Sequence, residues 1–173
     1  MSRYFFALWP DPLAREALGG HGARLARASG GRPVPAANLH LTLVFLGEVG
    51  PSRVASVHQA AEQVDARSFE LRLDEIGSFR PARVAWTGFR EPLPALLELQ
   101  GELALGLASR GFGTEARPFA PHLTLVRRIV SPVAREPIAP VSWRVMSFAL
   151  VVSDRVRGGY ATVAEWPLRE GVD

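Results

Sequence analysis

The sequence predicts an internally duplicated α+β fold with mainly antiparallel sheets, and three observations support this prediction. The tetrapeptide His-Leu-Thr-Leu occurs twice, at residues 40–43 and 122–125. Each copy follows the same expected order of a strand, a helix and then the tetrapeptide strand. Expected strands outnumber expected helices and do not alternate strictly with them, which favours α+β over a doubly wound fold.

The first expected unit covers about residues 3–47. It begins with an apolar strand at residues 4–9, followed by a helix at residues 11–29 that two glycines stop. A stiff, proline-containing loop at residues 32–35 then leads into a strand at residues 39–46, which carries the first tetrapeptide.

Two further elements are expected between the two units. Residues 52–66 have the pattern of an amphipathic helix, because Val54, Val57 and Ala61 recur at helical spacing. Residues 69–76 alternate apolar and polar side chains, which predicts a strand with one buried face.

The second expected unit covers about residues 83–128. It repeats the order of the first, with a strand at residues 83–89, a helix at residues 91–110 and a strand at residues 122–128. The proline that opens the helix precedes the histidine by 28 positions in the first unit and by 30 in the second. These near-equal spacings predict two copies of one unit.

Two more strands are expected after the second unit, at residues 142–152 and 160–168, around a turn at residues 157–159. No linker, low-complexity segment or heptad repeat interrupts the sequence. We therefore expect residues 1–173 to form a single bilobal domain.

The composition limits the possible classes of function. The 173 residues include no cysteine, which excludes a thiolate nucleophile, a disulfide framework and a cysteine metal site. All 20 basic residues are arginine, but the formal net charge is only +3, so a polyanionic partner is compatible without being required. The short apolar run near the start is too brief for a signal peptide or a membrane span, so we expect a soluble, cytoplasmic protein.

The repeated tetrapeptide predicts a catalytic groove. Alternate residues of a strand share a face, so each copy presents its histidine and threonine on one face and its two leucines on the other. Two units packed about a pseudo-two-fold axis would line one groove with His40, Thr42, His122 and Thr124. One imidazole could then take a proton from a nucleophile while the other protonates a leaving group, and the hydroxyls could hold the oxygens of a phosphodiester.

Other interpretations of these residues remain open. A histidine beside leucines can be a buried structural group, and the threonines can simply be strand formers. Two histidines can also bind zinc, although no third ligand is spaced to join either tetrapeptide. Arg127 could add a charge-assisted bond to a phosphate. In a regular strand, however, Arg127 has the opposite parity to His122, so it reaches the groove only if the strand bulges or ends there.

The segments around both tetrapeptides resemble the paired motifs of the 2H phosphoesterases. They read Asn-Leu-His-Leu-Thr-Leu-Val-Phe-Leu-Gly-Glu at residues 38–48 and Pro-His-Leu-Thr-Leu-Val-Arg at residues 121–127. The branch they resemble is that of the RNA 2′,3′-cyclic phosphodiesterases, formerly called 2′-5′ RNA ligases. The resemblance extends over nearly the whole chain, including residues 3–8, 84–86 and 148–153.

Combined with the expected elements, the resemblance implies a bilobal fold in which two sheets flanked by helices enclose a central cleft. It also implies hydrolysis of a terminal 2′,3′-cyclic phosphate to a 2′-phosphate, without a metal or nucleotide cofactor. His40 would be the general acid that protonates the departing O3′, and His122 the general base that activates water. The near symmetry of the site leaves the reverse assignment open.

The resemblance also implies roles for four neighbouring residues. Thr42 and Thr124 would hold the phosphate, with Arg127 as its cationic clamp. Phe45 lies where the family places an aromatic side chain that can stack on the terminal base, although it could equally belong to the core.

The expected partners are RNA ends or nucleotides that carry a 2′,3′-cyclic phosphate, with tRNA fragments among the candidates, and we expect a monomer. Two alternative functions remain. The same groove could join RNA ends through a 2′-5′ linkage, or the protein could bind RNA ends without turnover. The presence of both histidines and both threonines argues against the non-catalytic alternative.

Overall fold

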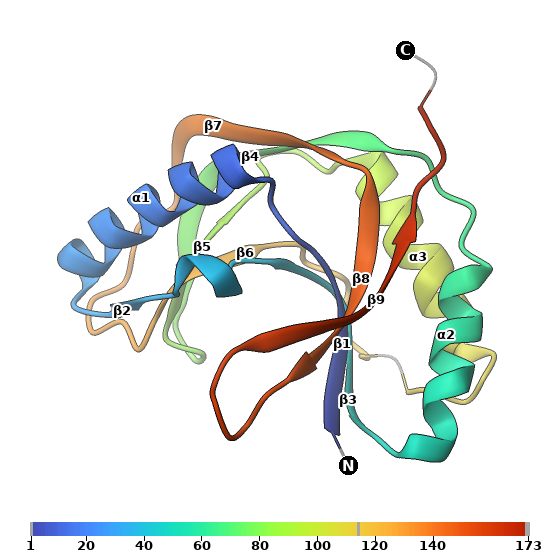
Figure 1. Ribbon diagram of the computed structural model, residues 1–173. Helices are drawn as coiled ribbons and strands as arrows, with labels where there is room; N and C mark the ends of the chain where they lie inside the picture. Colours follow the sequence, from blue (N-terminus) through green and yellow to red (C-terminus); the bar gives the residue numbers. More distant parts are fainter. Residues whose placement is uncertain (1, 114, 172–173) are drawn as a thin grey trace.

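The computed structural model describes residues 2–113 and 115–171, which form one large antiparallel sheet and three α-helices (Figure 1). The helices are α1 (Pro12–Ser29), α2 (Val54–Glu62) and α3 (Pro94–Ala108). The strands are β1 (Ser2–Leu8), β2 (Arg32–Pro33), β3 (Leu41–Val49), β4 (Phe69–Phe79), β5 (Val84–Gly88), β6 (Leu123–Arg127), β7 (Glu136–Val145), β8 (Ser147–Ser153) and β9 (Tyr160–Pro167). The expected α+β class is confirmed.

The sheet has the order β7-β4-β5-β6-β3-β1-β8-β9, and the short strand β2 pairs with β6. Its two halves meet at β3 and β6, where Leu41 pairs with Leu123. The two expected sheets are therefore halves of one continuous sheet. The two halves have matching neighbours. Strand β1, which precedes α1, lies beside β3 and the first tetrapeptide, and β5, which precedes α3, lies beside β6 and the second tetrapeptide. This order is consistent with internal duplication.

Local sequence signals explain the position of α1. The Asp11 carboxylate accepts a hydrogen bond from the backbone N–H of Ala14 at 2.8 Å, and Pro12 occupies the first turn. The helix ends at Gly30, whose φ of 71° is readily adopted by glycine, and the Gly30 N–H donates to the Ala26 carbonyl. The expected limits of this helix are confirmed.

The expected single strand at residues 142–152 is wrong. The chain forms two strands there, which separate at the exposed Met146. Strand β7 pairs with β4 in one half of the sheet, whereas β8 pairs with β1 in the other half. The apolar run continues across this break because both strands contribute to the core, so the pattern of the sequence gave no sign of the crossing.

Other boundaries also differ from expectation. The loop at residues 32–35 contributes strand β2, which pairs with β6. Helix α3 begins at Pro94 instead of residue 91, because Leu93 precedes a proline and is extended, with φ −107° and ψ 102°. Helix α2 ends at Glu62 instead of residue 66.

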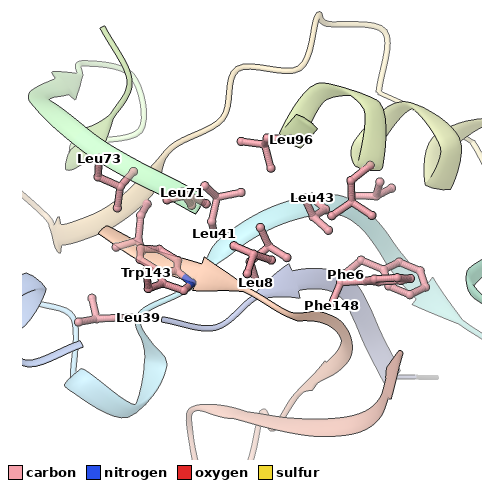
Figure 2. Close-up of a cluster of buried hydrophobic side chains, with 14 of the residues drawn as sticks. Phe6, Leu8, Leu39, Leu41, Leu43, Leu71, Leu73, Leu96, Trp143 and Phe148 are labelled. Atoms are coloured by element: carbon pink, nitrogen blue, oxygen red, sulfur yellow. The ribbon is translucent and has the colours of Figure 1, made fainter. Parts of the chain in front are cut away.

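The two faces of the sheet have different environments. The main core lies on the face covered by the helices and includes Phe6, Leu8, Leu41 and Leu43 (Figure 2). A second, smaller cluster on the other face contains Phe5, Ala7, Ala149 and Val151. The alternation of β1 therefore places buried side chains on both faces, and this smaller cluster forms an apolar surface on the face opposite the main core. None of the helices in the described segments is long and apolar enough to cross a membrane.

Candidate active site

The two tetrapeptides lie next to each other on the face of the sheet opposite the main core. Leu41 and Leu43 are buried in the main core, as are Leu123 and Leu125. The intervening histidines and threonines are partly exposed, as the alternation predicts. Because β3 and β6 run antiparallel through the Leu41–Leu123 pair, the histidine immediately before each strand lies towards the threonine of the other strand.

Both imidazoles are oriented by the backbone two residues earlier. The Nδ1 atom of His40 lies 2.7 Å from the carbonyl oxygen of Asn38, and Nδ1 of His122 lies 2.9 Å from that of Ala120. A carbonyl oxygen only accepts hydrogen bonds, so Nδ1 carries a proton in both rings. Each neutral ring therefore presents an unprotonated Nε2 atom that can accept a proton. For His40, this atom lies 3.1 Å from the hydroxyl of Thr42, which donates to it.

The surroundings of the two histidines differ. The His40 ring contacts three aromatic rings, with centroid distances of 4.9 Å to Phe5, 5.0 Å to Tyr160 and 5.6 Å to Trp9. The His122 ring contacts Phe79 edge-on at 5.1 Å. The aromatic cage on the first half of the sheet thus encloses only His40.

This cage has an electrostatic consequence. Burial lowers the pKa of His40 below its ordinary value, because the charged imidazolium loses hydration. The hydrogen bond to the Asn38 carbonyl acts in the opposite direction, and the charge of the Arg127 guanidinium and the proximity of His122 lower the pKa of His40 further. Without a bound anion, the neutral form of His40 is therefore favoured.

A β-bulge in β3 brings Phe45 to the same face as His40. Thr42 pairs with Ala7 and Val44 pairs with Phe6, which leaves Leu43 as an extra residue. Leu43 and Val44 are consequently both buried, and the alternation resumes in the opposite phase. Phe45 emerges on the face of the histidine, with 47% of its surface exposed.

An equivalent bulge in β6 brings Arg127 to the same face as His122. Thr124 pairs with Trp86 and Val126 pairs with Ala85, so Leu125 is the extra residue. Leu125 and Val126 are both buried, whereas Arg127 is exposed. This is the bulge that Arg127 requires in order to reach the groove.

Sequence reasoning missed several residues that surround the histidines. Tyr160 begins β9, and Trp9 follows β1 with its indole N–H donating to Thr162 at 3.1 Å. Arg32 pairs directly with Arg127 through β2. The alternation of the first strand could have indicated Phe5, since Phe5 and Ala7 have the parity opposite to the core residues. No local signal in the sequence indicated Tyr160 or the pairing of Arg32.

The other two histidines lie outside the groove. His21 is on α1 beside Arg24, and His58 is on α2, where its ring contacts Trp166 at 5.4 Å. Within residues 2–113 and 115–171, no group of three or more histidine, aspartate or glutamate side chains is arranged to hold a metal ion.

One face of the sheet thus presents two imidazoles of the same tautomer, two hydroxyls and an arginine. Acid–base phosphoryl transfer requires a site of this kind. A family model described as LigT-like phosphoesterase matches residues 9–86. An RNA 2′,3′-cyclic phosphodiesterase of Escherichia coli is 35% identical over 171 residues, which cover 97% of each chain. The Thermus thermophilus protein of the same name is 33% identical and covers 94% of this chain and 88% of its own.

Solved structures of other proteins have the same fold as this chain. The structure of Escherichia coli LigT complexed with 3′-AMP has a TM-score of 0.88 and 35% identity, and the match covers 96% of this chain and 98% of that one. The MHV ns2 PDE domain shares the fold alone, with a TM-score of 0.59, 15% identity and a match that covers 84% of this chain and 98% of that one. The chain belongs to the LigT-like phosphoesterases, the family of these RNA 2′,3′-cyclic phosphodiesterases. The expected membership of the 2H phosphoesterases is thereby confirmed.

Proposed function

We propose that the protein hydrolyses the 2′,3′-cyclic phosphate at an RNA end to a 2′-phosphate, without a metal ion, through His40 and His122. The observation that carries this proposal is the matched orientation of the two rings, each holding a proton on Nδ1 and presenting Nε2. The names of the related proteins support the same reaction.

The proposed reaction is an in-line displacement at phosphorus. Nε2 of His122 takes a proton from water as the water oxygen attacks the phosphorus atom. The bond between phosphorus and O3′ breaks, and the protonated Nε2 of His40 gives its proton to O3′. The phosphate remains on O2′. Each histidine ends in the protonation state in which the other began, so protons exchanged with solvent restore the site.

The remaining groove residues stabilise the charge on the phosphate. The hydroxyls of Thr42 and Thr124 donate to the non-bridging oxygens, and Arg127 supplies a charge-assisted hydrogen bond. Phe45 stacks on the terminal base, which its position on the His40 face and its exposure support.

The lowered pKa of His40 is compatible with a role as the acid. A bound phosphate brings a negative charge next to the ring and offsets the charge of Arg127, and both changes favour the imidazolium form. Substrate binding would therefore supply the protonated His40 that the reaction needs. In the reverse assignment, the neutral His40 would act as the base.

One chain contributes both histidines, so we propose that a monomer with a single bilobal domain is the working unit. Its substrates would be RNA ends or nucleotides that carry a 2′,3′-cyclic phosphate, with fragments of tRNA as one candidate. The groove needs no residue from a second chain to complete its pair of histidines.

The test compares histidines inside and outside the groove. The variants H40A and H122A should each lose about 10²- to 10⁴-fold in kcat with adenosine 2′,3′-cyclic phosphate, the usual contribution of a general acid or base. The variant H21A changes a histidine outside the groove and should keep the full rate, and a chelator should leave the wild-type rate unchanged. Normal turnover by H40A or H122A would refute the proposal.

A further inference from the structure

Strand β2 places two arginines side by side next to the groove. Arg32 and Arg127 are direct partners in the antiparallel pairing of β2 with β6. Directly opposed residues share a face of the sheet, and like charges in such a pair are destabilising. Among the ion pairs of residues 2–113 and 115–171, none involves Arg32, Arg127 or the neighbouring Arg128. A cluster of three cations without a carboxylate partner is the arrangement of an anion-binding site.

A cavity of about 160 Å³ lies at this cluster. Its lining consists of Arg32, Pro33, Val34, Pro35, Asn38, Arg127, Arg128 and Tyr160. Two of these residues also contact His40, since the Asn38 carbonyl accepts from its Nδ1 atom and the Tyr160 ring packs against it. The cavity therefore lies directly beside the first histidine of the groove.

The segment that carries Arg32 is held rigidly. The N–H of Val34 donates to the Leu125 carbonyl at 2.8 Å, which extends the pairing of β2 beyond Pro33. A Cβ atom at Gly31 would lie 2.6 Å from a methyl group of Val126 and 2.8 Å from the Arg127 carbonyl oxygen, so only glycine allows this close approach. The backbone of Arg32 is thus fixed beside that of Arg127 before any ligand binds.

A cyclic phosphate is a diester and carries one negative charge, so it can neutralise only one of the arginines. We propose that Arg32 binds a second phosphate of the substrate, the one on the 5′ side of the terminal nucleoside, with Arg128 lining the same subsite. This inference rests on the proposed function, in which Arg127 serves the cyclic phosphate. Consecutive phosphates of RNA are separated by one nucleoside, and two long side chains on adjacent strands can each reach one of them. The preferred substrate is therefore the end of a polynucleotide and not a nucleoside cyclic phosphate.

The test measures binding of two nucleotides that differ by one phosphate. Adenosine 3′-monophosphate and adenosine 3′,5′-bisphosphate are titrated calorimetrically into the wild-type protein, R32Q and R27Q. The wild-type protein should bind the bisphosphate about tenfold more tightly, because a hydrogen bond to a charged group contributes on this scale. R32Q should lose this preference to within about twofold while its affinity for the monophosphate is kept. R27Q removes the same charge from the exposed side of α1, which packs on the opposite face of the sheet, and should retain the preference.

Three results would overturn the inference. They are a wild-type protein that does not distinguish the two ligands, an R32Q variant that keeps the preference, and an R32Q variant that weakens both ligands equally. Turnover of adenosine 2′,3′-cyclic phosphate by the same wild-type preparation separates this inference from the proposed function. Absence of turnover would refute the proposed function, whereas the binding comparison decides the second phosphate site by itself.

Discussion

Replacement of Gly31 with alanine tests how β2 is held against β6. An added Cβ atom would meet a methyl group of Val126 at 2.6 Å, the Arg127 carbonyl oxygen at 2.8 Å and a methyl group of Ile129 at 3.0 Å. Two of these atoms belong to buried side chains and the third to the backbone of β6, so none can move aside cheaply. Strand β2 must therefore move away from β6.

The expected cost follows from these contacts. Overpacking of a close contact destabilises a protein by about 1–3 kcal/mol, and each backbone hydrogen bond that is weakened adds about 1 kcal/mol. We expect G31A to lower the free energy of unfolding by about 2–4 kcal/mol. In a chain of this size, each 1 kcal/mol lowers Tm by about 2–4 °C.

A matched variant is available in the same part of the chain. Gly20 lies in the interior of α1, and a Cβ atom there would have no neighbour within 4 Å. The variant G20A should raise the free energy of unfolding by about 0.5–1 kcal/mol, because alanine is the better helix former. Urea denaturation measures both variants. A G31A protein as stable as the wild type would refute the described packing of β2.

Three further predictions concern the groove. The variant Y160A opens the aromatic cage to water and should raise the pKa of His40 towards its ordinary value, which an NMR titration of the imidazole measures; a pKa that stays or falls would contradict burial as the main cause. The variant F45A should raise KM for a dinucleotide that ends in a 2′,3′-cyclic phosphate about 5- to 100-fold, because stacking is lost, while the free energy of unfolding changes little. A large loss of stability would instead assign Phe45 to the core. His40 binds a proton more weakly in the folded chain than in the unfolded chain, so the free energy of unfolding should fall as the pH drops below about 6.5 towards the lowered pKa. The variant H40Q should show a weaker dependence on pH. An equal dependence in H40Q would assign the effect to other groups.

The features of the groove that depend on local sequence were predictable. Alternation alone indicated that His40 and Thr42 share one face and that the adjacent leucines are buried, and the structure confirms both points. The capping aspartate and the glycines after residue 29 fixed the limits of α1. Such signals act over a few residues, which is why a single sequence reveals them.

The features that depend on distant partners were not predictable. A bulge exists only relative to the strand beside it, so the extra residues Leu43 and Leu125 could be identified only from the register of β1 and β5. The aromatic cage combines the first strand with the last, because Phe5 and Tyr160 lie far apart in the sequence. The union of the two halves through Leu41 and Leu123 is likewise a long-range pairing.

The identity of the product tests the proposed reaction most directly. Phosphorus NMR of adenosine 2′,3′-cyclic phosphate incubated with the wild-type protein distinguishes a 2′-phosphate from a 3′-phosphate. Protonation of O3′ by one histidine while the other activates water predicts the 2′-phosphate alone, with almost none formed by H40A or H122A in the same time. A 3′-phosphate product, or the 2′-phosphate formed at the wild-type rate without either histidine, would contradict the mechanism.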